Sequence, residues 1–317
     1  MKSKIVVVGS INCDININVA ALPQRNETVM GQKSALKLGG KGLNQAVAAA
    51  RAGADVTMVA CVGRDAFGES AKAYLVDNHV DIRHVYSSED LATGTASIFV
   101  DDNAHNMIVV APEANTQLSP GLVALAEAEI AAADVVVVQM EVPLESIRKT
   151  LELARKHSVL SILNPAPANT SVLDILYLAD IITPNESETE LLSGLYPHDT
   201  KSSLKAAKLL QQAGAHCVVI TRGSDGCDYL LDDKIKHIEP FSITAVDPTG
   251  AGDVFNGALA CSLATSTLTQ SSLDDAIVRA SAAAAMSVTK PYAQNAAPFC
   301  EEIDAFITQN KRQAQLA

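Results

Sequence analysis

Six short apolar runs, separated by stretches of helical length, constrain the fold more than any other feature of this sequence. The runs are rich in Val and Ile and stay apolar at consecutive positions, which is typical of strands covered on both faces. The stretches between them are rich in Ala and Leu and favour helices. The runs are 5–8, 56–61, 135–139, 159–163, 181–183 and 217–221, and the predicted helices are 42–52, 68–77, 119–132, 143–156, 186–194 and 201–213.

This alternation predicts an α/β fold, a three-layer α/β/α sandwich around a central, mostly parallel sheet. A hairpin over 229–238 follows, and then helices over 251–264, 273–288 and 298–309. Short β-like segments in 16–38 and 93–110 interrupt the alternation and predict a small separate sheet. We expect one main domain, formed by 1–15, 39–92 and 111–310, and a β lid, formed by 16–38 and 93–110, that covers a cleft or pairs with a second subunit.

Charge and composition favour small-molecule partners. The net charge is −12 and no run is rich in Lys or Arg, so the sequence lacks the electrostatic pattern of proteins that bind nucleic acid or anionic membranes. The apolar run near the N-terminus is too short for a signal peptide, and no apolar run reaches 18 residues, which predicts a soluble cytoplasmic protein. The six cysteines form no CxxC pair and are expected to be reduced thiols, mostly in the core.

The segment DPTGAGDVFNG, at 247–257, is the most informative motif because small residues precede an acidic residue at a predicted helix start. The N–H groups of a glycine turn and the positive end of the helix can hold an anion. Asp253 would then lie beside a transferred phosphoryl group, where position matters more than basicity because the proton leaves late. Alternatively, Asp253 only caps the helix and the glycines form a turn. The chain has no GxxxxGK[ST] P-loop.

Two motifs suit a polyhydroxylated ligand. GGKGLNQA, at 39–46, adds a lysine and an amide to glycines that open a helix, and it does not fit the GxGxxG dinucleotide pattern. GSINCD, at 9–14, follows the first strand, and in extended backbone its Asn12 and Asp14 face the same side. The alternatives are a helix entry with Lys41 in solvent, and Asx-turn residues after a strand.

Three further motifs follow predicted strands. In TPNESE, at 183–188, Asn185 caps a helix and Glu188 reaches a metal-bound water, or both residues serve capping alone. TRGSDG, at 221–226, forms a glycine turn that suits nucleotide phosphates or an ordinary hairpin. Glu141, after the apolar run 135–139, is either an acceptor for a hydroxyl group or a surface residue.

GSINCD, GGKGLNQA, NPAP at 164–167, TPNESE, TRGSDG and DPTGAGD occur in the order, and at about the spacing, found in the ribokinase branch of the ribokinase-like carbohydrate kinases. The resemblance covers 5–306 and implies ATP-dependent phosphorylation of the 5-hydroxyl of D-ribose to give ribose 5-phosphate. It implies that Asp253 is the catalytic base and that Gly250, Ala251 and Gly252 form an anion hole. The sugar site that it implies comprises Asn12, Asp14, Gly40, Lys41, Gly42, Asn44, Glu141 and Asp253.

The resemblance also implies sites for ATP, Mg²⁺ and a monovalent cation, K⁺, and a lid that joins two subunits into a homodimer. The nucleotide side comprises Asn185, Glu188, Thr221, Arg222, Gly223, Ser224, Asp225, Gly226 and Gly252, with Ser281 near the adenine. The K⁺ site comprises Asp247, Thr249, Ser287, Lys290, Tyr292 and Ala296. Tyr292 stands where the family usually has Gly, Ala296 where it usually has Ser, and Glu113 where a small residue or Gly normally precedes Ala-Asn. Backbone carbonyls supply much of the K⁺ coordination and survive such changes.

Rival functions remain open from the sequence. One is a kinase for another furanose, 2-deoxyribose or a nucleoside. Asn12 beside Asp14 favours ribose over deoxyribose because buried hydroxyl partners discriminate strongly, and Glu141 is placed to hold the C1 hydroxyl that a nucleoside lacks. A catalytically silent sugar sensor would be free to lose Asp253. A Rossmann-type dehydrogenase shares the strand–helix alternation but would need a fingerprint that the chain does not contain.

Overall fold

The computed structural model describes residues 2–103, 105–264, 266–290 and 296–316, without the side chains of 106 and 311–316. In these residues the large sheet has the order β13-β12-β11-β10-β9-β8-β1-β4-β5. Every pair from β5 to β11 is parallel and the last two pairs are antiparallel, which confirms the mostly parallel sheet. The strands are β1 (Lys4–Val8), β4 (Asp55–Gly63), β5 (Val80–Ser88), β8 (Val135–Gln139), β9 (Leu160–Asn164), β10 (Ile181–Ile182), β11 (Cys217–Thr221), β12 (Cys227–Leu231) and β13 (Lys234–Ile238).

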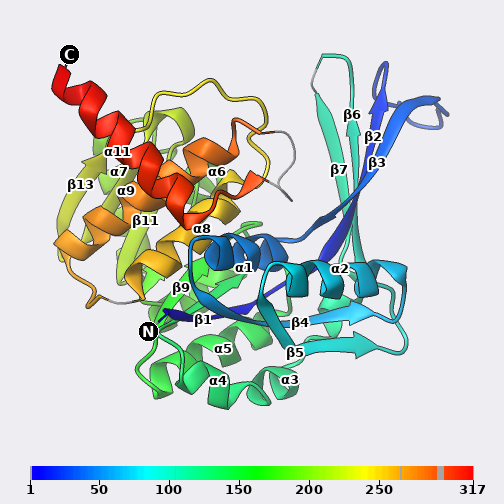
Figure 1. Cartoon of the computed structure of the whole chain (residues 1–317), viewed down its shortest axis with the longest axis horizontal. Helices are drawn as coiled ribbons and strands as arrows, with labels where there is room; N and C mark the ends of the chain where they lie inside the picture. The colour runs from blue at the N-terminus through cyan, green and yellow to red at the C-terminus, as the bar shows by residue number, and fades with distance from the viewer. Residues whose placement is uncertain (1, 104, 265, 291–295, 317) are drawn as a thin grey trace.

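Helices cover both faces of this sheet, as Figure 1 shows. In β1, Ile5 and Val7 join one buried cluster while Val6 and Val8 join the other, which explains why the run is continuously apolar. The first cluster includes residues of α1 (Lys41–Arg51), α2 (Ala66–Asp77), α8 (Ala251–Leu263), α9 (Gln270–Ser287) and α11 (Cys300–Leu316). The second includes residues of α3 (Pro120–Ala124), α4 (Glu127–Ala131), α5 (Leu144–Lys156), α6 (Glu186–Ser193), α7 (Thr200–Gln212), and the 3₁₀ segments η1 (Glu113–Gln117) and η2 (Thr170–Leu178).

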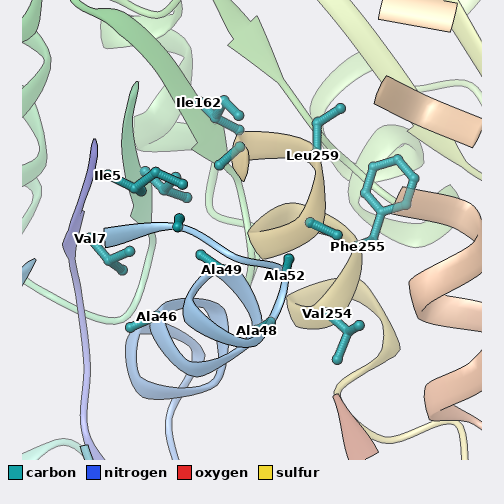
Figure 2. Packing of buried hydrophobic residues seen from close by; sticks show 14 of the residues in the cluster. Ile5, Val7, Ala46, Ala48, Ala49, Ala52, Ile162, Val254, Phe255 and Leu259 are labelled. Atoms are coloured by element: carbon teal, nitrogen blue, oxygen red, sulfur yellow. The ribbon is translucent and has the colours of Figure 1, made fainter. Parts of the chain in front are cut away.

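Helices α1 and α8 pack closely against each other. In Figure 2 the buried alanines of α1 face the start of α8 near Val254, whereas Phe255 points away from α1. Small side chains on the α1 surface allow the two backbones to approach. The first turns of both helices are therefore neighbours, although about two hundred residues separate them in the chain.

The small sheet has the order β3-β2-β6-β7 and confirms the predicted separate β-sheet. Its strands are β2 (Asn12–Val19), β3 (Gly31–Gly39), β6 (Gly94–Val100) and β7 (Asn106–Ala111). The sheet stands away from the α/β body in Figure 1. Since β2 already begins at Asn12, Asn12 and Asp14 belong to this small sheet and lie where it joins the body.

Two elements differ from the prediction. The helix expected over 119–132 is two short helices, because Leu125 N–H and Ala126 N–H donate to Leu122 and Val123 in i→i−3 bonds that tighten the backbone there. The strand β5 was not predicted, since its sequence VDIRHVYSS mixes polar with apolar residues, as an edge strand can.

The six cysteines, at 13, 61, 217, 227, 261 and 300, are free thiols, and the first four are buried. No helix among the described residues has both the length and the apolar character needed to cross a membrane.

Candidate active site

The polar motifs that follow the parallel strands meet at one edge of the large sheet. Because the strands run in the same direction, the residues after β1, β8, β9 and β10 reach the same end of the molecule. The first turns of α1 and α8 lie at this edge, where hydrogen bonds join Asn44 and Gln45 of α1 to Asp253 of α8. The predicted catalytic and sugar-binding segments are therefore together in space.

Asp253 lies in the first turn of α8 and is 7% exposed. Gly250 precedes the helix in left-handed backbone, with a φ of 78° that favours glycine. One carboxylate oxygen, Oδ2, accepts a bond of 3.0 Å from Asn44 Nδ2. The other, Oδ1, accepts a bond of 3.0 Å from Gln45 Nε2. Among the described residues, the carboxylate is thus held by two neutral donors and by no lysine or arginine hydrogen bond.

The start of α8 also offers backbone donors to an anion. Ala251 N–H donates to Pro248 O at 3.2 Å, and Gly252, which follows it, is exposed. The N–H groups in the first turn of a helix have no acceptor within the helix and carry positive potential. An anion at Gly250, Ala251 and Gly252 would lie next to the Asp253 carboxylate.

Glu141 connects three segments of the site. Its Oε2 accepts bonds from Ser10 Oγ, at 2.5 Å, and from Lys41 N–H, at 3.0 Å. Gly40, the N-cap residue of α1, has no side chain that could cap the helix. The Glu141 carboxylate, which follows β8, accepts a hydrogen bond from the first turn of α1 instead. Gly42 is buried in the same turn. The role of Ser10 was missed by sequence reasoning, because a lone serine after a strand gives no specific signal.

Lys41 lies among four carboxylates, from Asp14, Glu141, Glu188 and Asp253. Burial alone would lower the pKa of Lys41, but these carboxylates raise it above its ordinary value. The pKa of Asp14 is raised to about 6 by burial and by the charges of Glu141 and Asp253, against the opposing effect of Lys41. Burial also raises the pKa of Glu188. Four carboxylates surround one lysine, so the site carries net negative charge. It therefore favours ligands that donate hydrogen bonds from hydroxyl groups, and bound cations, over a further carboxylate.

A second amide outside the predicted set positions Asn12. Asn115, from η1, is buried, and its Nδ2 donates to Asn12 Oδ1 at 2.8 Å and to Ile11 O at 3.2 Å. Its own Oδ1 accepts from Ile11 N–H at 2.9 Å. Since Asn12 Oδ1 is occupied, Asn12 Nδ2 is the atom left to face a ligand. The sequence places these residues 103 positions apart, and no local pattern connects them.

One buried polar atom at the site lacks a partner among the described residues. Asn44 Oδ1 is inaccessible to solvent and accepts no hydrogen bond there. A buried carbonyl oxygen without a donor is unfavourable, and a ligand hydroxyl would satisfy it. This atom supports a polyhydroxylated ligand beside Asn44.

The two loops predicted for the nucleotide lie side by side. Thr221 N–H donates to Pro184 O at 3.0 Å, and a β-bridge joins Asn185 to Thr221. Asn185 and Glu188 form a reciprocal capping box, so capping occupies one oxygen of each side chain. Gly223, Ser224 and Asp225 are exposed in a 3₁₀ turn, η3, that Gly226 closes. Ser281 lies inside α9, and among the described residues it has no hydrogen bond to this turn.

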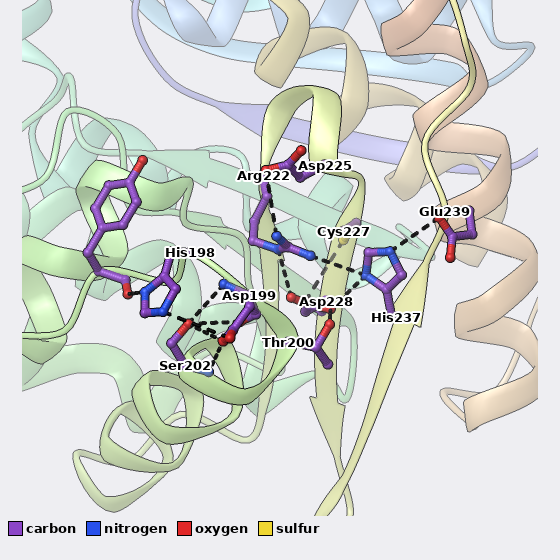
Figure 3. Close-up of polar contacts among 11 residues, drawn as sticks. His198, Asp199, Thr200, Ser202, Arg222, Asp225, Cys227, Asp228, His237 and Glu239 are labelled. Atoms are coloured by element: carbon purple, nitrogen blue, oxygen red, sulfur yellow. Dashed lines mark hydrogen bonds and ion pairs between the residues drawn. The ribbon is translucent and has the colours of Figure 1, made fainter.

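Arg222, predicted to bind the nucleotide, directs its side chain into the protein. Figure 3 shows its guanidinium beside Asp228, with Arg222 Nε 2.8 Å from Asp228 Oδ2. His237 Nδ1 and Thr200 Oγ1 contact the other oxygen of Asp228, at 2.8 and 3.0 Å. The buried guanidinium therefore fixes the base of the turn, and the exposed backbone of the turn is what can meet a phosphate.

The residues predicted for a monovalent cation come from two adjoining segments. The N–H groups of Val246 and Asp247 both donate to Val288 O, at 2.7 and 3.1 Å. Asp247 and Thr249 are thereby next to the end of α9, where Ser287 is buried and Lys290 N–H bonds Ser287 O. Ala296 is buried as well. Tyr292 lies outside the described residues.

No cluster of three His, Cys, Asp or Glu residues that could hold a metal occurs in the part of the chain that the structure describes. Mg²⁺ does not require such a cluster, because it commonly binds through one or two carboxylates, several waters and the substrate's phosphates. Glu188 has one carboxylate oxygen outside its capping bond and can serve in that way.

Comparison with known proteins gives consistent results. Residues 2–300 match the family described as pfkB family carbohydrate kinase. The chain is 40% identical to the ribokinase of Haemophilus influenzae, over 97% of this chain and 99% of the relative. It is 33% identical to the deoxyribokinase of Salmonella typhi, over 97% and 99% of the two chains. The structure of Arabidopsis thaliana ribokinase complexed with ribose and ATP superposes with a TM-score of 0.86, at 26% identity, over 96% and 99% of the chains.

Proposed function

Because the chain belongs to the pfkB family of carbohydrate kinases, we propose that it transfers the γ-phosphoryl group of ATP to the 5-hydroxyl of D-ribose. The observation that carries the proposal is the position of Asp253, a buried carboxylate at the start of α8 between a glycine turn and the Asn44 amide. The similarity to ribokinases at 40 and 36% identity supports ribose as the acceptor.

Each group in the site has a role in this reaction. Asp14 and Glu141 accept hydrogen bonds from ring hydroxyls, while Asn12 Nδ2 and Lys41 donate to them. Asp253 takes the proton of the 5-hydroxyl as its oxygen attacks the γ-phosphorus and the bond to ADP breaks. The anion turn of Gly250, Ala251 and Gly252 stabilises the charge on the migrating phosphoryl group, with the N–H groups of Gly250 and Gly252 as its donors.

The nucleotide lies along the loops at Asn185 and Thr221 to Gly226, with Ser281 on its adenine side. Glu188 would hold Mg²⁺ through water, and the ion would neutralise charge on the phosphates. Asp247, Thr249, Ser287, Lys290, Tyr292 and Ala296 would hold K⁺ next to the anion turn. Both ions remain part of the proposal.

We also propose a cytoplasmic homodimer that forms through the small sheet. In β7, an edge strand, Met107, Ile108, Val109 and Val110 are all exposed, and so is Leu36 in β3, the other edge. Exposed apolar edges of this kind favour pairing with another chain. The same sheet would close over the sugar as a lid and exclude water from the transfer.

A kinase for 2-deoxyribose is the second candidate, since a deoxyribokinase is among the relatives. Asn12, oriented by Asn115, and Asp14 favour a sugar with an additional hydroxyl group. A sensor that binds sugar without turnover would not need Asp253.

The test is ADP release with ribose, 2-deoxyribose, fructose, adenosine and uridine, in Mg-ATP with K⁺ or Na⁺. We expect strong turnover with ribose and loss of at least about 100-fold in Asp253→Asn. Turnover of deoxyribose alone would select the second candidate. Ribose binding without turnover in the wild type would select the sensor.

A further inference from the structure

We propose that Gln45 is a positioning residue for the base: it fixes Asp253 Oδ1 so that Oδ2 is the oxygen that takes the sugar proton. The inference rests on the proposed function and concerns a residue outside the predicted sites. Gln45 is 0% exposed in α1 and contacts neither solvent nor the loops expected to bind the nucleotide.

Among the described residues, the Gln45 side chain makes three hydrogen bonds, all of them to polar side chains. Its Nε2 donates to Asp253 Oδ1 at 3.0 Å and to Asn164 Oδ1 at 3.1 Å. Its Oε1 accepts from Gln139 Nε2 at 2.7 Å. Gln139 and Asn164 are the last residues of β8 and β9, so the amide is anchored to the ends of two central strands.

The charge of Asp253 determines the direction of every amide in this chain of contacts. An ionised carboxylate only accepts hydrogen bonds, so Gln45 must present its NH₂ group to Asp253. Gln45 Oε1 must then face Gln139, which has to donate, and this leaves Gln139 Oε1 without a donor. The opposite orientation would place Gln45 Oε1 against two acceptors. The orientation is therefore set by Asp253, and it leaves the buried Gln139 oxygen without a partner among the described residues.

The two oxygens of Asp253 are therefore not equivalent. Oδ1 faces the fully buried Gln45, whereas Oδ2 faces Asn44, a partly exposed residue with an unpartnered oxygen of its own. Only the Oδ2 side adjoins the proposed sugar. In the transfer, the proton of the 5-hydroxyl moves to Oδ2, the freed electron pair forms the new O–P bond, and the bond between the γ-phosphorus and ADP breaks.

A role in catalysis and a role in folding alone make different predictions for Gln45→Met, which keeps the length of the side chain and removes both polar atoms. If Gln45 positions Asp253, kcat per folded active site falls about 10- to 100-fold, while the KM and Kd for ribose change less than about threefold. Gln212→Met is the matched control, because Gln212 ends α7 in an exposed position and belongs to none of the predicted sites.

Gln139→Met keeps the inference testable if Gln45→Met does not fold. It removes the unpartnered Gln139 oxygen but leaves Gln45 Oε1 without its donor, so the melting temperature should be unchanged or lower. It also removes the donor that holds Gln45 Oε1, so the Gln45 amide loses one of its three anchors, and we expect kcat to fall about 3- to 10-fold with ribose affinity unchanged.

Wild-type turnover separates the two proposals. If the wild type does not phosphorylate ribose or deoxyribose, the proposed function fails. If the wild type is active and both glutamine variants retain its kcat, or lose kcat only in proportion to folded protein, the role of Gln45 is refuted.

Discussion

At the scale of single side chains, Asp14 predicts how stability varies with pH. Its folded-state pKa is about 6, above the ordinary value of 3.8, so between these pH values the folded chain binds the proton more tightly than the unfolded chain does. The stabilisation that protonated Asp14 contributes to the folded state is fully present below pH 4 and is lost as pH rises through 6. Asp14→Asn has no titrating group at this position and does not lose this stabilisation. The difference between its free energy of unfolding and that of wild type should therefore increase by up to about 3 kcal/mol between pH 4 and pH 7.5.

Urea unfolding of both proteins across this pH range measures the difference. Asp102→Asn, an exposed change in the turn between β6 and β7, is the control for removal of a carboxylate near the same sheet. A constant difference between Asp14→Asn and wild type would contradict the raised pKa.

Glu113 lies where the resemblance to ribokinases implies a small residue or Gly, and its backbone gives a reason. Its φ is 45°, in the left-handed region, where a side chain costs about 1 kcal/mol and glycine does not. Glu113→Gly should therefore raise the free energy of unfolding by about 0.5 kcal/mol, after allowance for the greater entropy of glycine in the unfolded chain. Gln117→Gly, in the same 3₁₀ segment at negative φ, should lower it. Destabilisation by both changes to the same extent would exclude backbone strain at Glu113.

At the scale of elements, the contact between α1 and α8 controls the distance between the sugar site and the base. A Cβ added to Gly257 would lie 2.6 Å from Gln45 O and 2.7 Å from Ala48 Cβ. Gly257→Ala should force the helices apart, lower the free energy of unfolding by about 1–3 kcal/mol and reduce kcat. Gly121→Ala, where the nearest atom is 3.6 Å away, should be neutral or stabilising. Denaturant titration and ribose turnover, measured together, test this; equal effects of the two alanines would contradict it.

Most of the elements could be predicted from the sequence, but the contacts between them could not. Continuous apolar runs predicted the parallel sheet because Ile5 and Val6 enter opposite cores. The glycine motifs predicted where α1 and α8 begin. The pairing of Gln45 with Asp253, 208 residues apart, depends on helix packing that no local pattern encodes. The inward turn of Arg222 was likewise not predictable, because its partner Asp228 lies on the next strand of a hairpin.

At the scale of the whole molecule, the small sheet predicts the oligomeric state. Val109 is 59% exposed on the edge strand β7, and a charge there should oppose edge or face pairing with a second copy. We expect wild type to sediment as a dimer at micromolar concentration and Val109→Lys or Ile108→Lys to shift it towards the monomer. Leu125→Lys, at an exposed site on the α/β body, should leave the dimer intact. A monomeric wild type would refute the proposed dimer.

If Asp253 is the base, as proposed, the amides behind it also determine how the enzyme is reset after each turnover. Gln45, Gln139 and Asn164 neither gain nor lose protons near neutral pH, so the buried side of the base offers no route for a proton. The proton taken from one sugar must leave from the Oδ2 side, which the phosphorylated product still covers. Restoration of the base is thereby coupled to departure of the product, and a buffer acid or base can act on Asp253 only after the site has opened.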